Sequence, residues 1–128
     1  MSRTLLVIDD SKSILSVISY IFGSKYTVEK KFNGLEALDW MQQGNMPDII
    51  VSDIDMPEMD GFTLLKHLKS SSIFEDIPFI ILSSIDNSAE KIRCLKMGAD
   101  DYVVKPFNPE ELEARIANII RRKERYVK

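Results

Sequence analysis

Four short apolar runs, each about the length of a β-strand, constrain the fold of this chain more than any other feature of its sequence. They occupy residues 4–8, 48–52, 77–83 and 102–104, and a weaker, alternating run occupies residues 26–32. The runs are rich in Val, Ile and aromatic residues, which favour strands. The first three are almost continuously apolar, as is typical of parallel strands that are covered on both faces. The chain is therefore predicted to form a parallel sheet.

The segments between these runs have the periodicity of helices. Apolar residues recur at helical spacing within residues 14–22, 35–41, 62–68, 92–97 and 112–120. Gly98 is placed to end the fourth helix, and Pro109 is placed to begin the fifth. Strands and helices thus alternate five times, and right-handed crossovers then produce a doubly wound α/β sheet with helices on both faces. We predict one such domain over residues 1–124, followed by a short tail at 125–128.

Composition limits what this domain can do. Its 128 residues suit a single domain. Its net charge of −3 argues against sequence-independent binding of nucleic acid, which depends on many Lys and Arg side chains. One cysteine cannot form an internal disulfide. The apolar run at residues 5–8 is too short for a signal peptide or a membrane span. We expect a cytoplasmic protein that binds neither nucleic acid nor membrane through this domain.

Charged and hydroxyl side chains follow the predicted strands at the point where each strand ends. They are Asp9 and Asp10 after the first strand, Asp53 after the third, Ser83 after the fourth and Lys105 after the fifth. In open α/β sheets, ligands bind outside the carboxyl ends of the strands. We therefore expect these side chains to lie together on one rim of the sheet and to form the functional site.

This set of side chains suits phosphoryl transfer. Crowded carboxylates raise each other's pKa values, and a hard divalent cation such as Mg²⁺, which prefers oxygen ligands, relieves the repulsion. A single His and a single Cys do not provide the usual zinc site. A carboxylate beside such a metal can attack phosphorus, and the negative charge of the transferred group then needs partners on three oxygens. Mg²⁺, the Lys105 ammonium and the Ser83 hydroxyl provide one partner each.

Four stretches of the chain resemble the receiver domain of two-component response regulators, chemotaxis regulators included. In order along the chain they are LLVIDD, DIIVSDIDMPEMDG, IPFIILSS and GADDYVVKPF. The resemblance extends over essentially the whole chain and implies a flavodoxin-like sheet of five strands in the order 2-1-3-4-5, with five helices. It implies a signalling switch that catalyses its own phosphorylation and dephosphorylation, rather than an enzyme with a separate substrate. The implied phosphoryl donor is a histidine kinase or a histidine phosphotransfer protein.

The resemblance also implies a role for each residue of the rim. Asp53 would be the phosphoacceptor, and Lys105 would bind the phosphoryl group. Asp9 and Asp10 would position Mg²⁺, or Mn²⁺ in its place. Asp53 itself and the backbone carbonyl of Asp55 would complete the protein's share of the metal ligands.

Further residues are implied to transmit the signal. Ser83 would be the switch hydroxyl and Tyr102 the switch aromatic, which swings inward as Ser83 moves. The peptide bond between Lys105 and Pro106 is expected to be cis. The surface of the fourth helix, fifth strand and fifth helix would change on phosphorylation. A homodimer on phosphorylation is one interpretation of the charged residues on that surface, and ordinary solvated charge is the other; the residues are Lys91, Asp101, Glu111 and Arg115.

Two other classes of protein fit part of the pattern. A haloacid-dehalogenase-like phosphatase also uses an Asp-x-Asp motif at a strand end, which Asp53 and Asp55 match. Such enzymes usually carry this motif on their first strand, and Pro57 stands where they have Thr or Val. A flavodoxin shares the predicted fold, but Asp9 and Asp10 would repel the phosphate of its cofactor.

Overall fold

The structure, a computed structural model, describes residues 2–127 and has a five-stranded sheet with five helices. In chain order the elements are β1 (Arg3–Ile8), α1 (Lys12–Phe22), β2 (Tyr26–Lys31), α2 (Gly34–Gln42), β3 (Ile49–Ser52), α3 (Gly61–Lys69), β4 (Phe79–Ser83), α4 (Ser88–Met97), β5 (Asp101–Val104) and α5 (Pro109–Val127). Neighbouring strands are parallel and lie in the order β2-β1-β3-β4-β5. The predicted fold class and strand order are confirmed.

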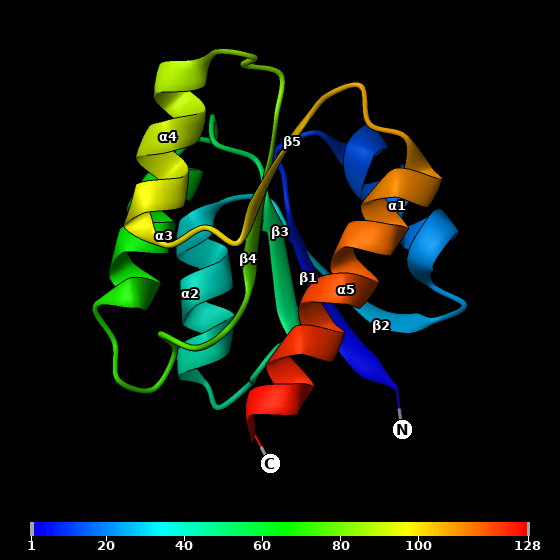
Figure 1. The fold of residues 1–128 in the computed structure, drawn as a ribbon, viewed down its shortest axis with the longest axis vertical. Coiled ribbons are helices and arrows are strands. Elements are labelled where there is room, and N and C mark those ends of the chain that lie inside the picture. Colours follow the sequence, from blue (N-terminus) through cyan, green and yellow to red (C-terminus); the bar gives the residue numbers. More distant parts are fainter. Residues whose placement is uncertain (1, 128) are drawn as a thin grey trace.

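Helices cover both faces of the sheet, with α2, α3 and α4 on one face and α1 and α5 on the other (Figure 1). Successive residues of the central strands enter opposite cores, because side chains alternate across a strand. In β1, Leu6 and Ile8 pack beneath α2, α3 and α4, whereas Leu5 and Val7 pack beneath α1 and α5. This double burial explains why the central strands read as continuous apolar runs.

All five helices begin at the carboxyl ends of the strands with a polar cap. The side chain that precedes each helix accepts a hydrogen bond from a backbone N–H in its first turn; these residues are Ser11, Asn33, Asp60, Asn87 and Asn108. Such caps satisfy N–H groups that have no partner within the helix. Gly98 ends α4 in the left-handed conformation, with φ of 117°, as its position in the sequence predicts.

Some apolar residues of the helical patterns lie outside the core. Val17, Leu35, Ile92 and Leu95 are each between 46% and 50% exposed. In α4 only Cys94 is fully buried; Met97 is partly buried against the same core, and Ile92 and Leu95 are about half exposed. Periodicity thus located the helices correctly but overstated the apolar faces of α1, α2 and α4.

Helix α5 extends to Val127 and passes through the predicted boundary after residue 124. The division into a domain at residues 1–124 and a tail at 125–128 stays a prediction. Among residues 2–127, no helix is both long enough and apolar enough to cross a membrane.

A pair of leucine variants tests how the sheet is buried. Leu6 is fully buried in β1, whereas Leu35 is half exposed on α2. Leu6→Ala is expected to lower the free energy of unfolding by about 2–5 kcal/mol, because it removes packed atoms and leaves a cavity. Leu35→Ala is expected to change it by less than about 0.5 kcal/mol. Urea denaturation measures both, and equal losses would contradict the described burial.

Candidate functional site

Three carboxylates meet at the carboxyl rim of the sheet. Asp9, Asp10 and Asp53 each place one side-chain oxygen within 4.8 Å of the others. Asp9 is buried, Asp53 is largely buried and Asp10 is exposed. The group therefore has one open side, toward solvent. Mg²⁺ prefers hard oxygen ligands and keeps several waters in its octahedral shell, so a partly open group of carboxylates fits the predicted metal.

The register of the parallel strands brings the two buried acids together. Ile8 of β1 pairs with Ser52 of β3, so the next residue of each strand, Asp9 or Asp53, leaves the sheet at the same level. The Asp53 backbone N–H donates to the Ile8 carbonyl oxygen at 2.9 Å, which extends the ladder by one residue. The sequence thus places both carboxylates through strand length and register alone.

Lys105 places a positive charge between the acids. Its Nζ lies 2.8 Å from Asp9 Oδ2 and 3.6 Å from Asp53 Oδ2, and its side chain is mostly buried. The Lys105 backbone N–H donates to the Ser83 carbonyl oxygen at 2.8 Å, which ties the ends of β4 and β5. The following Lys105–Pro106 peptide bond is cis. The Lys105 ammonium therefore contacts two of the three grouped carboxylates, and these four side chains together carry an excess of negative charge.

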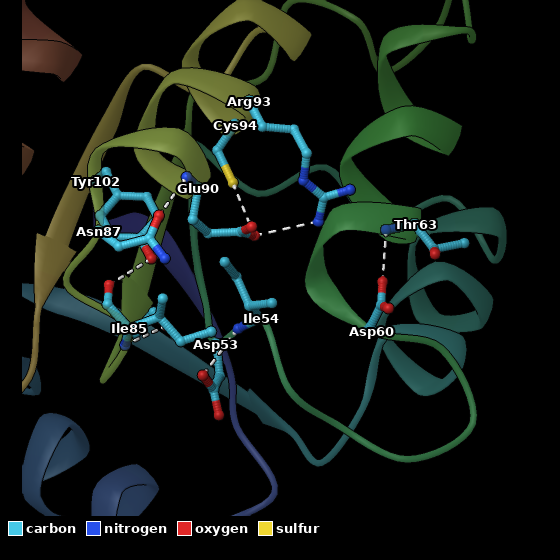
Figure 2. Close-up of polar contacts among 11 residues, drawn as sticks. Asp53, Ile54, Asp60, Thr63, Ile85, Asn87, Glu90, Arg93, Cys94 and Tyr102 are labelled. Atoms are coloured by element: carbon cyan, nitrogen blue, oxygen red, sulfur yellow. Dashed lines mark hydrogen bonds and ion pairs between the residues drawn. The ribbon is translucent and has the colours of Figure 1, made fainter.

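This environment raises the pKa of the Asp53 carboxyl above its ordinary value. Burial is the largest cause, and the negative charges of Asp9 and Asp10 add to it. Lys105 opposes the shift, as does the hydrogen bond that Asp53 Oδ1 accepts from the Ile54 N–H at 2.8 Å (Figure 2). The other oxygen, Oδ2, faces Lys105. The contacts with Lys105 and the Ile54 N–H thus do not fully offset the cost of the negative charge on Asp53, and a bound cation would stabilise that charge.

The loop that follows Asp53 folds back tightly over the end of β3. Gly61 donates its N–H to the Ile54 carbonyl oxygen at 2.8 Å. A Cβ at Gly61 would lie 2.1 Å from the Asp53 carbonyl oxygen, so no other residue fits there without moving the backbone of Asp53. Within the loop, Glu58 has a φ of 68°, which L-residues with a side chain rarely adopt. The Asp55 side chain lies exposed on this loop.

Ser83 and Tyr102 both contact the loop between β4 and α4. The Ser83 Oγ accepts a hydrogen bond from the Ile85 N–H at 3.1 Å, and the Tyr102 hydroxyl donates to the Ile85 carbonyl oxygen at 2.7 Å (Figure 2). Tyr102 is buried, so in this structure its ring already lies inward. Burial raises the pKa of the Tyr102 hydroxyl, and a hydrogen bond with Ser83 opposes the rise. Ile85 is the shared partner, and sequence analysis did not predict it.

Helix α4 is held to α3 by a charged contact that sequence analysis missed. The Arg93 guanidinium lies 3.6 Å from the centre of the Phe62 ring, and it also donates to Glu90 at 3.1 Å (Figure 2). The Glu90 carboxylate is 3.9 Å from the Cys94 sulfur. Burial raises the pKa of the Cys94 thiol to about 11, which makes it an inert core residue. The spacing of Glu90 and Arg93 is visible in the sequence, but their packing against Phe62 is not.

The charged residues predicted to form a dimer face are paired within the chain. Lys91 Nζ lies 2.8 Å from Asp86, and the Arg115 guanidinium lies 2.7 Å from Asp101 and 2.8 Å from Glu111. These side chains are partly or largely exposed, so each pair contributes little to stability. All four charged side chains therefore already form ion pairs within one chain, without a second copy.

Comparison with known proteins places the chain in a family. The family described as "Response regulator receiver domain" matches residues 5–117, and the chain belongs to it. The probable transcriptional regulator ycf27 of Cyanophora paradoxa is 41% identical over 123 residues, which are 95% of this chain and 50% of that protein. The alkaline phosphatase synthesis transcriptional regulatory protein PhoP of Bacillus subtilis is 37% identical over 97% of this chain and 51% of its own length. This chain therefore spans about half the length of these curated relatives.

Solved structures agree with this assignment. A putative response regulator from Chloroflexus aurantiacus superposes with a TM-score of 0.88 at 32% identity, covering 94% of this chain and 98% of that one. The receiver domain of the Francisella response regulator 1452 superposes with a TM-score of 0.86 at 38% identity, with the same coverage of both chains. The protein is thus the receiver domain of a two-component response regulator, a signalling switch. The alternative of a haloacid-dehalogenase-like phosphatase is left without support.

The raised pKa of Asp53 predicts a pH-dependent effect of its removal. The folded protein holds this proton more tightly than the unfolded chain, so the ionised carboxylate lowers the free energy of unfolding as pH rises above the ordinary value of 3.8. Without divalent cations, Asp53→Asn is expected to be more stable than the parent at pH 7. The gain is expected to disappear below pH 3.8, where both states of the parent are protonated. Urea denaturation at the two pH values measures it.

The exposed neighbour Asp55 provides the matched control for this prediction. Asp55→Asn is expected to give no comparable gain at pH 7, because its carboxylate is already in water. Mg²⁺ is expected to shrink the gain of Asp53→Asn, since the cation binds the parent, which has the additional carboxylate, more tightly than the variant. A loss of stability in Asp53→Asn at pH 7 would contradict the described electrostatics.

Proposed function

We propose that Asp53 accepts a phosphoryl group from a phosphohistidine of a histidine kinase or a histidine phosphotransfer protein. The observation that carries this proposal is the position of Lys105 Nζ, 2.8 Å from Asp9 and 3.6 Å from Asp53. A buried ammonium beside a carboxylate of raised pKa is suited to bind the negative oxygens of a group transferred to that carboxylate. Acetyl phosphate, a small donor, is expected to replace the protein donor in the test tube.

The two carboxylate oxygens of Asp53 have different roles. Oδ1 accepts the Ile54 N–H, which holds the carboxylate in place, and Oδ2 faces Lys105 and attacks phosphorus. As the new O–P bond forms, the N–P bond of the phosphohistidine breaks, and its electron pair returns to the imidazole. The product is an aspartyl phosphate, and attack by water later releases inorganic phosphate and restores the carboxylate. The chain thus promotes both its own phosphorylation and its own dephosphorylation.

Asp9, Asp10, Asp53 and the backbone carbonyl of Asp55 are the proposed ligands of Mg²⁺ or Mn²⁺. A divalent cation here would offset the repulsion of the carboxylates and neutralise charge on the phosphoryl oxygens. Asp9 also holds Lys105 Nζ at 2.8 Å, so it orients the ammonium as well as contributing an oxygen. Asp10 is the most exposed of the three, so it borders the solvent-facing side of the group.

The phosphoryl group is proposed to act on α4 through Ile85. The Ser83 hydroxyl can donate its proton to a phosphoryl oxygen while its Oγ still accepts the Ile85 N–H. A movement of Ser83 toward Asp53 therefore pulls on Ile85, whose carbonyl oxygen holds the Tyr102 hydroxyl at 2.7 Å. Tyr102 lies on β5 and Ile85 precedes α4, so the surface of α4, β5 and α5 responds.

Mass spectrometry tests the acceptor. With acetyl phosphate and Mg²⁺, the protein is expected to gain the mass of one phosphoryl group, which peptide mapping places on Asp53. Asp53→Asn and addition of a chelator are each expected to abolish the gain. Asp55→Asn is the control and is expected to retain it, because the proposed ligand at that position is the backbone carbonyl. Full labelling of Asp53→Asn would refute the assignment.

We also propose that phosphorylation promotes a homodimer through the surface of α4, β5 and α5. Arg115 is paired with Asp101 and Glu111 in the single chain, and these pairs can be exchanged between two copies around a twofold axis. Ile92 and Leu95 of α4 are half exposed and offer apolar area to such an interface. The paired charges would set the register of the two copies.

Light scattering tests the dimer. With beryllofluoride as the phosphate mimic, the molar mass of the parent is expected to double at concentrations at which the untreated protein is a monomer. Arg115→Ala is expected to stay a monomer after the same treatment. Its labelling by acetyl phosphate is expected to be unchanged, because Arg115 lies outside the proposed acceptor site. A parent that remains a monomer with beryllofluoride would refute the dimer and leave the acceptor assignment in place.

A further inference from the structure

The start of α2 contacts the loop that carries Asp55. The N–H of Gly34, the first residue of α2, has no partner within its helix and donates instead to the Met59 carbonyl oxygen at 3.0 Å. A Cβ on Gly34 would lie 2.8 Å from that oxygen and 3.0 Å from Met59 Cγ. The closest of these atoms belongs to the backbone, so a side chain at position 34 forces the loop itself to move. Only glycine permits this approach.

The contact holds a strained part of the loop. Met59 donates its N–H to the Pro57 carbonyl oxygen at 2.8 Å, which closes a γ-turn around Glu58, whose φ is 68°. This form of γ-turn is rare and strained, and it persists only where the surrounding structure holds it. Gly34 holds the Met59 carbonyl on one side of the turn. On the other side, the Gly61 N–H holds the Ile54 carbonyl oxygen at 2.8 Å.

We propose that Gly34 is a positioning residue for the metal site. Asp55 lies between the two held points, Ile54 and Met59, so its backbone carbonyl is placed by them. Gly34 touches neither metal nor phosphoryl group and acts through Met59. Mg²⁺ demands near-ideal octahedral geometry, so a loop moved by a few tenths of an ångström binds it less well. The inference rests on the proposed function, because it takes the Asp55 carbonyl as a ligand.

Two glycine variants at opposite ends of α2 separate positioning from stability. Gly34→Ala is expected to weaken Mg²⁺ binding about tenfold, the loss typical of residues that orient a ligand without contacting the metal. Gly44→Ala is the control. Gly44 has a φ of 105° and no atom within 4 Å of its would-be Cβ, so alanine there costs stability through strain alone. It is expected to leave Mg²⁺ affinity unchanged. Urea denaturation records the stability of both variants.

Shifts of backbone amide signals in NMR spectra measure the Mg²⁺ dissociation constant. Parental affinity in Gly34→Ala, with saturable shifts at Asp9, Asp10 and Asp53, would overturn the positioning role and leave the proposed metal site intact. An equal loss of affinity in Gly44→Ala would also overturn it, because the effect would then follow stability. The absence of any Mg²⁺-dependent shift in the parent would overturn both proposals together.

Hydrogen exchange in the unmodified protein tests the same inference without a variant. If the Gly34 contact favours Mg²⁺ binding, bound Mg²⁺ must favour the Gly34 contact by the same factor. Mg²⁺ is therefore expected to slow exchange of the Gly34 N–H more than that of the Gly44 N–H, which donates to the Met41 carbonyl oxygen at 3.0 Å. The Gly44 amide corrects for any general stabilisation by the cation. Equal slowing of the two amides would overturn the proposal.

Discussion

The contact of Lys105 with Asp9 and Asp53 is the interaction around which the site is organised. Three carboxylates converge where β1 and β3 end, and within the described residues Lys105, directly after β5, is the cation that contacts them. Burial makes this imbalance costly, because little water screens the charges. The sheet tolerates it because its apolar strands hold the backbone firmly on both faces. The rigid sheet thus holds the carboxylates in an arrangement that favours binding of a cation.

The fold was predictable because its strongest signals are local. Continuous apolar runs marked the central strands, and Gly98 and Pro109 marked helix ends. Val17, Leu35, Ile92 and Leu95 were harder, because spacing along a helix shows which residues share a face but not how far a neighbouring element covers that face. Each helix packs only one of its faces against the sheet, and α4 lies near the edge of the sheet (Figure 1).

The gathering of the charged side chains at one rim was predictable, whereas the contacts that support them were not. Asp9, Asp53 and Lys105 each follow a strand, so topology alone brings them to one rim. The close approach of Gly34 to Met59 joins residues far apart in sequence through backbone atoms, which carry no signal in side-chain patterns. The stacking of Arg93 on Phe62 likewise depends on how α3 and α4 pack. Sequence patterns report which groups are present, whereas distances of a few ångströms arise only from the assembled fold.

The attachment of α4 has a consequence for any protein that recognises this surface. Its one fully buried side chain is Cys94, Met97 is partly buried against the same core, and the Arg93–Phe62 stack joins the helix to α3. A helix with so little apolar burial can change its orientation while the hydrophobic core remains closed. If a second orientation of α4 has a similar free energy, a partner with modestly higher affinity for it would redistribute the population between the two. A binding protein could therefore select one orientation of α4 even in the unphosphorylated chain, and signal strength would depend on its concentration as well as on the kinase.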